Sequence, residues 1–184
     1  GLTLGGGFGR LSRRYGLTCD QLTSVDIVTA DGRLLEASAT ANDDLFWGVR
    51  GGGGNFGVVT SFEYRLHPFD GWAIGGHLVF PFEQARQALR GFAELYPRAP
   101  EGLWIEPILT TTPGGGRVLI LDVCCSDPPA AAEAALVPYR KLGKAIEDDV
   151  KRVRYSVLQT KDDERARIGG RYYTKSGFTD TLDD

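Results

Sequence analysis

The 184-residue sequence contains no methionine and begins with glycine, so we expect a fragment or a processed product of a longer chain. Its longest apolar runs are far shorter than the roughly 20 residues that span a membrane, and no basic segment typical of a signal peptide opens it. With a net charge of −3 and no Lys/Arg-rich run, it lacks the basic surface that nucleic-acid binding requires. We therefore expect a globular protein without a membrane or nucleic-acid partner.

Cysteine and histidine are scarce. The three cysteines are Cys19, Cys124 and Cys125, and an odd number with two adjacent argues against a disulfide framework and favours a reducing compartment such as the cytoplasm. His67 and His77 lie apart in the sequence, and no C-x-x-C, H-E-x-x-H or acidic calcium loop occurs. No metal site is therefore expected.

Glycine, in contrast, is concentrated in two runs. Gly51–Gly54 continues into Asn55, Phe56 and Gly57, which spells the G-x-G-x-x-G pattern of nicotinamide-binding Rossmann domains. That pattern requires a strand before the glycines and a helix after them, whereas here residues 42–47 predict a helix before them and residues 58–66 a strand after them. Two alternatives remain: backbone lying close to a ligand, or glycines that only permit tight crossings of the chain.

The pattern in residues 1–69 predicts a small mixed unit. Glycines crowd residues 5–9, and a short helix is expected over 10–16 with a glycine after its last turn. Asp31-Gly32 between two apolar runs predicts a hairpin within residues 25–35. Asn42 is expected to cap the helix that follows it. In the strand over 58–66, alternation predicts one buried face, formed by Phe62, Tyr64 and Leu66.

From residue 70 to residue 184 the pattern changes to alternating strands and helices. Strands are predicted at 74–80, 103–110 and 118–125, and helices after Pro81 and after Asp127, which we expect to act as a cap. We interpret Pro113–Gly116 as a hairpin connection, not a phosphate cradle, because its neighbours carry no binding chemistry. Residues 154–159 and 171–176 are expected to be later strands or extended segments. The order predicts an α+β fold, an antiparallel sheet with helices on one face.

Five motifs in order carry a family resemblance. They are Gly1–Gly9, the segment from Arg14 to Asp20, the hairpin at Val28–Arg33, the helix at Asp44–Trp47 and the run Gly51–Thr60. Together they closely resemble FAD-linked oxidases with a vanillyl-alcohol-oxidase-type, or PCMH-type, FAD-binding domain, in the berberine-bridge-enzyme-like branch. The resemblance implies that residues 1–69 are the C-terminal half of that domain and that residues 70–184 belong to the substrate domain.

The resemblance also implies roles for individual residues. The cofactor-binding residues would be Gly5, Gly6, Gly7, Gly9, Asp20, Gly54, Asn55, Gly57 and Val58. Backbone N–H groups of the first glycines would face the FAD pyrophosphate, and Tyr155, Gln159 and Tyr173 would be substrate-side residues, although aromatic residues in a sheet are more often core. None of Cys19, His67 and His77 lies where the family links its flavin. The phosphate-binding loop and the linking residues would lie upstream of Gly1, and no catalytic residue is assigned.

The resemblance implies an FAD-dependent oxidoreductase in the complete form. It would oxidise a small organic or carbohydrate-like substrate by hydride transfer to flavin N5, with O2 as the expected electron acceptor. The fragment alone is expected to be inactive. The alternative from another class is a non-catalytic remnant or a module that supplies half of a split flavin site, and the nicotinamide-binding Rossmann enzyme survives only if residues 58–66 are helical.

Overall fold

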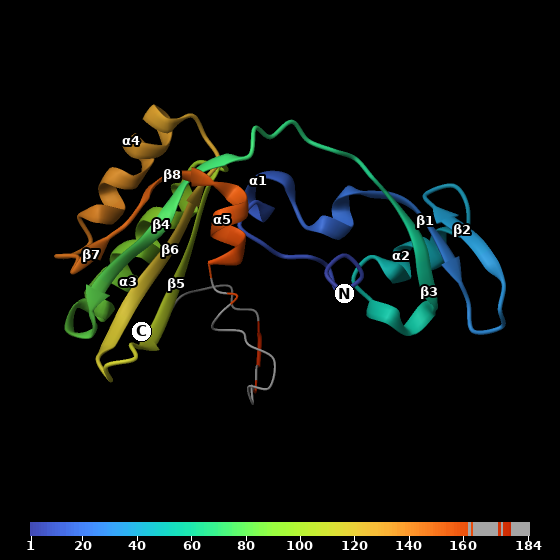
Figure 1. Cartoon of the computed structure of the whole chain (residues 1–184), viewed down its shortest axis with the longest axis horizontal. Helices are drawn as coiled ribbons and strands as arrows, with labels where there is room; N and C mark the ends of the chain where they lie inside the picture. Colours follow the sequence, from blue (N-terminus) through green and yellow to red (C-terminus); the bar gives the residue numbers. More distant parts are fainter. Residues whose placement is uncertain (162, 164–172, 174, 178–184) are drawn as a thin grey trace. The chain divides into compact units, whose positions relative to one another are not determined.

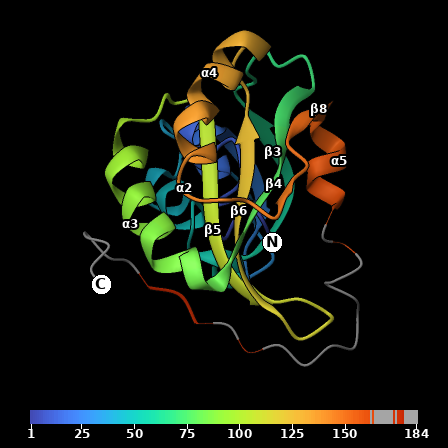
Figure 2. The same ribbon diagram turned by 90° about the vertical axis from the view of Figure 1, so that its left-hand side faces the viewer.

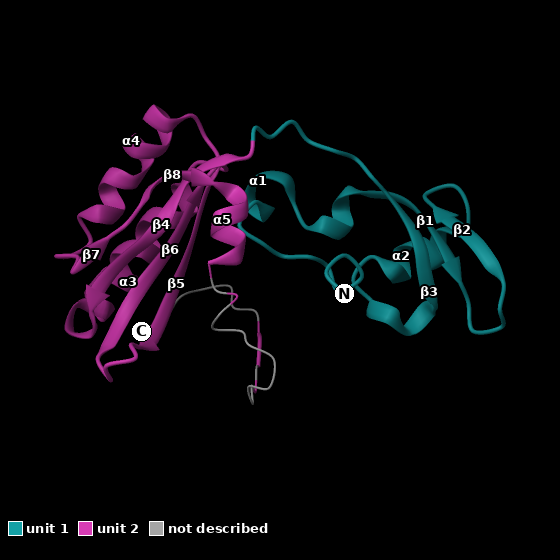
Figure 3. Ribbon diagram, viewed as in Figure 1, with its two compact units in different colours: residues 1–70 teal, residues 71–184 magenta. Residues whose placement is uncertain are grey.

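The computed structural model describes residues 1–161, 163, 173 and 175–177. The chain divides into two compact units, Gly1–Asp70 (unit 1) and Gly71–Asp184 (unit 2), shown in Figures 1 and 3. No helix in the described ranges is long and apolar enough to cross a membrane.

Unit 1 is a three-stranded antiparallel sheet with short helices. Its elements are α1 (Ser12–Tyr15), η1 (Thr18–Gln21), β1 (Leu22–Val28), β2 (Leu34–Ser38), α2 (Asp43–Val49), η2 (Gly53–Phe56) and β3 (Val58–Tyr64). The strand order is β2-β1-β3, so β1 is the central strand. The predicted hairpin is confirmed: the amide of Gly32, at φ 80°, donates to the carbonyl of Thr29 between β1 and β2.

The core of unit 1 is small. It is formed by buried residues of β1, β2 and α2, namely Leu22, Val25, Ile27, Ala37, Phe46 and Val49. Asn42 stands before α2 as expected, but in a left-handed conformation (φ 49°) and without a side-chain cap. Its Nδ2 atom instead donates to the carbonyl of Glu36 at 2.7 Å, so the side chain fastens the start of α2 to β2.

Of the predicted buried face of the strand over 58–66, Tyr64 is confirmed, whereas Phe62 and Leu66 are wrong. Phe62 is 39% exposed and Leu66 is 85% exposed, whereas Val59 and Tyr64 are the residues of this segment that pack against the core. The cause lies in the pairing of β3 with β1, whose register shifts twice and interrupts the strict alternation. The face therefore changes along a strand that the sequence pattern treats as regular.

Unit 2 is a five-stranded antiparallel sheet with helices. Its elements are β4 (Trp72–Pro81), η3 (Phe82–Gln84), α3 (Ala85–Leu95), η4 (Tyr96–Arg98), β5 (Leu103–Thr111), β6 (Arg117–Cys125), α4 (Pro129–Arg140), β7 (Glu147–Asp148), β8 (Lys151–Arg154) and α5 (Tyr155–Thr160). The strand order is β5-β6-β4-β7, and β8 also pairs with β4. As predicted, a turn at Pro113–Gly116 joins β5 and β6, with the amide of Thr112 donating to the carbonyl of Gly116.

Helices α3 and α4 pack together against one face of this sheet (Figure 2). The side chains between them form the larger core, in which Phe80 of β4, Phe92 of α3 and Leu136 of α4 are buried. Burial of apolar surface against a sheet is the main stabilising term for such a layer. The predicted α+β class is confirmed, with α3 and α4 on one face of an antiparallel sheet, while Leu158 of α5 packs on the other.

Two local predictions in unit 2 are wrong. Residues 155–160 form the helix α5 and not a strand, because β8 ends at Arg154 and Leu158 turns back onto β4. Helix α4 begins after Pro128, whose position carries no side-chain cap, so Asp127 does not cap it. The carboxylate of Asp127 lies instead against Gly102, at the start of β5. The segment predicted at 171–176 falls largely outside the described residues.

Candidate functional site

The two glycine runs of unit 1 meet in space. The amide of Gly53 donates to the carbonyl of Leu4 at 2.8 Å, which joins the run at Gly51–Gly54 to the N-terminal glycine segment. Residues 6 and 7 then turn with positive φ, and their carbonyls accept from the amides of Cys19 and Thr18. Segments about fifty residues apart in sequence thus form one continuous stretch of backbone with few side chains.

Packing within the chain explains only some of these glycines. A Cβ atom at Gly7 would overlap Thr18, one at Gly52 would overlap the carbonyl of Gly48, and one at Gly57 would overlap the carbonyl of Val28, each closer than 3.0 Å. These three positions need glycine for the fold itself.

Five other glycines of these two runs face open space. An added Cβ atom would meet no atom of the chain within 4 Å at Gly6, Gly9, Gly51, Gly53 and Gly54. Two of them, Gly9 and Gly54, also have an ordinary φ, so neither strain nor packing requires glycine there. The absence of a side chain at these positions leaves room for a ligand that lies directly on the backbone.

The backbone donors of the first glycines are already used. The amides of Gly5, Gly6 and Gly9 donate to the carbonyl of Gly1, the carbonyl of Thr3 and the Oγ atom of Ser12, at 3.0, 3.1 and 2.8 Å. In this conformation these residues offer a ligand close approach to the backbone rather than free N–H groups. The expected pyrophosphate contacts through those amides remain a prediction.

Of the three other residues expected at the cofactor, Asp20 and Asn55 contact their own loops. Asp20 accepts a hydrogen bond from the amide of Leu17 at 2.9 Å through Oδ2, which closes the turn at η1. Asn55 donates from Nδ2 to the carbonyl of Gly52 at 3.0 Å and so holds the shape of the glycine run. Val58, at the start of β3, is 70% exposed. Asp20 and Asn55 thus have a local role that the sequence did not suggest.

The nicotinamide interpretation is excluded by the same region. A Rossmann fingerprint needs a helix directly after its glycines, and residues 58–64 form β3. Among the described residues, no group of three or more His, Cys, Asp or Glu side chains could hold a metal ion. The three cysteines are free and buried, and burial together with the neighbouring Asp20 carboxylate raises the pKa of the Cys19 thiol.

The polar chemistry of unit 2 lies on the sheet face away from α3 and α4. There the Nε2 atom of His77 in β4 lies 3.6 Å from Oδ1 of Asp122 in β6, and Asp122 is 2% exposed. Of the three residues expected on the substrate side, Tyr155 and Gln159 lie one turn apart on α5, flanking Leu158, which packs on Gly75 of β4. Tyr173 is 85% exposed. The pair of His77 and Asp122 is not evident from the sequence, because it depends on how β4 pairs with β6.

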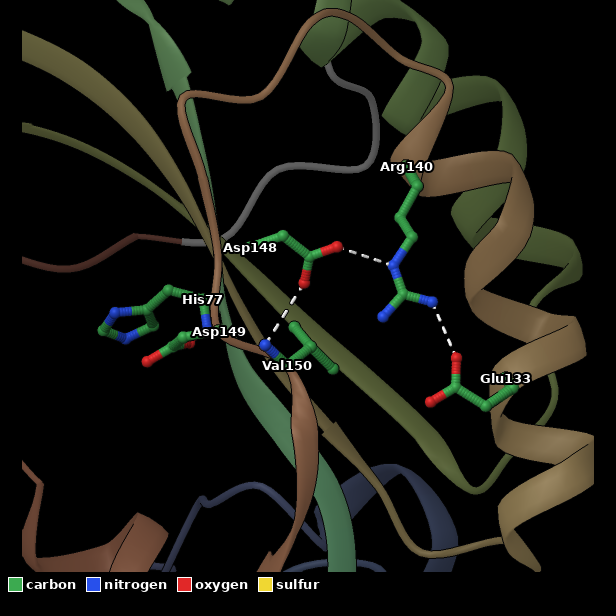
Figure 4. Close-up of polar contacts among 6 residues, drawn as sticks. All are labelled: His77, Glu133, Arg140, Asp148, Asp149 and Val150. Atoms are coloured by element: carbon green, nitrogen blue, oxygen red, sulfur yellow. Dashed lines mark hydrogen bonds and ion pairs between the residues drawn. The ribbon is translucent and has the colours of Figure 1, made fainter.

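Two further polar networks fasten the edge strands β7 and β8 (Figure 4). Arg140, in the last turn of α4, donates to Glu133 at 2.7 Å and to Asp148 of β7 at 2.8 Å, and the hydrogen bond with Glu133 is the main cause of its raised pKa. Asp149 accepts a hydrogen bond from the amide of His77, and it forms an ion pair with Lys161 at 3.3 Å. The first network ties β7 to α4, and the second ties the β7–β8 connection to β4.

Asp149 makes the stability of unit 2 depend on acid pH. Partial burial opposes its ionisation, but the His77 amide and the Lys161 ammonium group outweigh burial and hold the pKa of Asp149 below its usual value. The contribution is therefore present above the pKa of the unfolded chain and is lost as pH falls through the lower folded pKa. We expect the urea midpoint of the wild type to fall more steeply below about pH 4 than that of Asp149→Asn.

The exposed Glu101→Gln variant is the control for the charge change. It should keep the acid dependence of the wild type. An identical acid slope in Asp149→Asn and the wild type would show that Asp149 carries none of this dependence.

The chain has relatives among known proteins. Residues 1–38 match the family model described as FAD binding domain. Two relatives are FAD-linked oxidoreductases, one from Neurospora crassa (42% identity over 110 residues, 60% of this chain and 22% of the relative) and one from Dictyostelium discoideum (31% over 163 residues, 82% of this chain and 36% of the relative). The chain thus spans between about a fifth and about a third of these relatives.

Solved structures show the same fold. The 6-hydroxy-D-nicotine oxidase of Arthrobacter nicotinovorans matches 92% of this chain and 37% of its own, with a TM-score of 0.78 and 25% identity. The xylooligosaccharide oxidase of Myceliophthora thermophila matches 85% and 33%, with a TM-score of 0.71 and 28% identity. A BBE-like protein of Arabidopsis thaliana matches 87% and 33%, with a TM-score of 0.74 and 25% identity.

The fold is thus that of the flavoproteins of the vanillyl-alcohol-oxidase type. More particularly, the chain is similar to FAD-linked oxidoreductases, with berberine-bridge-enzyme-like proteins among its structural neighbours, and these findings support FAD as the cofactor. The matched segment, residues 1–38, contains the N-terminal glycines, two of which, Gly6 and Gly9, face open space.

Proposed function

We propose that this chain is part of an FAD-dependent oxidoreductase. Unit 1 supplies part of the FAD site, with Gly6, Gly9, Gly53 and Gly54 along the cofactor, and unit 2 supplies part of the substrate-binding domain. The observation that carries the proposal is the stretch of open glycines, held together by the bond between Gly53 and Leu4, within a unit that begins with a match to an FAD-binding family.

The glycine stretch fits a flat, elongated ligand. FAD presents an extended chain of ribitol and pyrophosphate that other proteins bind through backbone where side chains are absent. The flavin, when bound, would accept a hydride at N5, and O2 would serve as the electron acceptor. The part of this chain is to hold the cofactor along the backbone of unit 1, while unit 2 binds and orients the substrate.

The proposed substrate is a small organic or carbohydrate-like molecule. The support is the presence among the structural neighbours of a xylooligosaccharide oxidase and a carbohydrate oxidase, next to an oxidase of 6-hydroxy-D-nicotine. Anaerobic mixing of the complete protein with xylobiose, a chitooligosaccharide or 6-hydroxy-D-nicotine tests this directly. Bleaching of the flavin absorbance by one of them identifies the class of substrate, and a complete protein purified without flavin would overturn the proposed function.

The open glycines allow a sharp test of the FAD site. In the complete protein, Gly9→Ala and Gly54→Ala should weaken FAD binding at least tenfold, about 1.4 kcal/mol, because each adds a Cβ atom where the chain itself leaves space. Neither position has a positive φ, so the thermal midpoint should stay within about 2 °C of the wild type. Flavin fluorescence during dialysis measures the affinity.

The matched control is Gly114→Ala. Gly114 lies in the turn between β5 and β6, also has an ordinary φ, and meets only Thr112 Oγ1, at 3.9 Å. It should change neither affinity nor stability. If Gly9→Ala and Gly54→Ala bound FAD as well as Gly114→Ala does, the open glycines would not line the cofactor.

The isolated 184-residue chain should bind FAD weakly or not at all, since it spans only part of the relatives' length. A stoichiometric yellow complex formed by this chain alone would contradict that expectation. It would also favour a self-sufficient flavin module over a partial site.

A further inference from the structure

The two faces of the unit 2 sheet differ in chemistry. The face toward α3 and α4 is built from apolar side chains, including Leu78, Leu103 and Leu121. On the opposite face, one row across three strands is ionisable: Glu106 of β5 is directly opposite Asp122 of β6, which is directly opposite His77 of β4. Residues directly opposite in an antiparallel pair point to the same face and lie within contact distance.

The buried position of Asp122 is energetically unfavourable for a carboxylate. Asp122 is 2% exposed within β6, and its side chain lies on the same face of the strand as that of Cys124, which is fully buried. Placing a carboxylate in such surroundings costs several kcal/mol unless an opposite charge compensates it. The imidazole of His77, at 3.6 Å, is placed to supply that charge when protonated, while Glu106 opposite Asp122 opposes a further negative charge.

The row also connects the interior to water. The side chain of His77 is 16% exposed, Asp122 is buried and Glu106 is exposed at the far side of the row. On the backbone side, Asp149 accepts a hydrogen bond from the main-chain amide of His77, and Lys161 pairs with Asp149. The backbone of His77 is thereby fixed while its imidazole faces Asp122.

We propose that His77, Asp122 and Glu106 form a charged row in which His77 accepts the proton of the substrate. This rests on the proposed oxidoreductase function. The O–H bond of the substrate alcohol breaks and its proton passes to the imidazole. The flavin, when bound, would take the hydride of the adjacent C–H bond, so that the alcohol would become a carbonyl. Asp122 stabilises the imidazolium and is a positioning residue, Glu106 adds a second negative charge to the row, and the imidazolium returns the proton to water through its exposed edge.

The row can be tested without catalysis, by NMR of the 184-residue chain. The chain has two histidines, so His67→Gln leaves the imidazole signals of His77 alone. Asp122→Asn should lower the titration midpoint of His77 by about one pH unit, because it removes the compensating charge. Glu106→Gln should lower it less, and the exposed Glu101→Gln should leave it unchanged.

An unchanged midpoint of His77 in Asp122→Asn would overturn the row. If that variant does not fold, the carboxyl carbon signal of Asp122 is followed in the wild type and in His77→Gln. Coupling requires the signal to titrate differently in the two proteins, and identical curves would overturn the proposal as well.

The catalytic role is tested in the complete protein by anaerobic flavin reduction with xylobiose, a chitooligosaccharide or 6-hydroxy-D-nicotine. His77→Gln should slow reduction about 100-fold and remove the rise of the rate with pH, since only the neutral imidazole accepts a proton. Normal flavin content with wild-type reduction in His77→Gln would sink the row and leave the proposed function standing. A wild-type protein that holds no flavin, or whose flavin none of the three substrates reduces, counts against the proposed function and the row together.

Discussion

Replacing Phe80 by alanine is expected to destabilise unit 2 by about 3–5 kcal/mol. Phe80 lies in β4, the strand that pairs with β6, β7 and β8, and it is fully buried between the sheet and the two helices. Removing the ring loses its transfer free energy and leaves a cavity that the helices cannot close completely. A loss of this size is a large part of the stability of a small domain.

Tryptophan fluorescence during urea unfolding measures the loss. Trp104 of unit 2 is 7% exposed and reports on its core, whereas Trp47 of unit 1 is 75% exposed and changes little on unfolding. The matched control is Phe8→Ala, the same substitution at a ring that is 71% exposed, which should stay within about 0.5 kcal/mol of the wild type. Equal effects of the two substitutions would mean that the α3–α4 layer does not carry the stability of unit 2.

The elements that could be predicted from sequence are those specified locally. Asp31-Gly32 permits only a tight turn between two apolar runs, and the apolar spacing after Pro81 fits only a helix lying on a sheet, as α3 does. Where the outcome depended on distant partners, prediction failed. Tyr155–Thr160 became a helix because β4 accepts Leu158, and Phe62 became exposed because β3 pairs with β1 through two register shifts.

The candidate sites show the same division. Glycine runs indicate unusual backbone, so the place where the backbone of unit 1 lies open could be predicted. The sequence does not tell which glycine makes room for the chain and which leaves open space, because Gly57 and Gly54 differ only in backbone conformation and in what surrounds them. The pair of His77 and Asp122 could not be predicted, since residues 45 positions apart meet only through the register of β4 and β6.

Gly57 is a glycine that the fold of unit 1 itself requires, so its replacement should have a large effect on stability. Gly57→Ala should destabilise unit 1 by about 3 kcal/mol or more. Its φ of 148° is one that side chains avoid, and the added Cβ atom would overlap the carbonyl of Val28 and crowd Ile27. Val28 pairs with Val58 at the end of the β1–β3 ladder, so relief of the overlap requires the ladder to open there.

Gly54→Ala, three residues earlier, separates the two roles. It adds the same atom in open space at an ordinary φ, so unit 1 should keep its stability while FAD binding falls. Urea unfolding followed by amide NMR signals of β1 and β3 measures the first quantity, and flavin content of the complete protein the second. Gly57→Ala should lose both, because a cradle cannot form on an open ladder. If Gly57→Ala kept its stability and lost only the flavin, Gly57 too would be a ligand-facing glycine, and the overlap with Val28 would be relieved without cost.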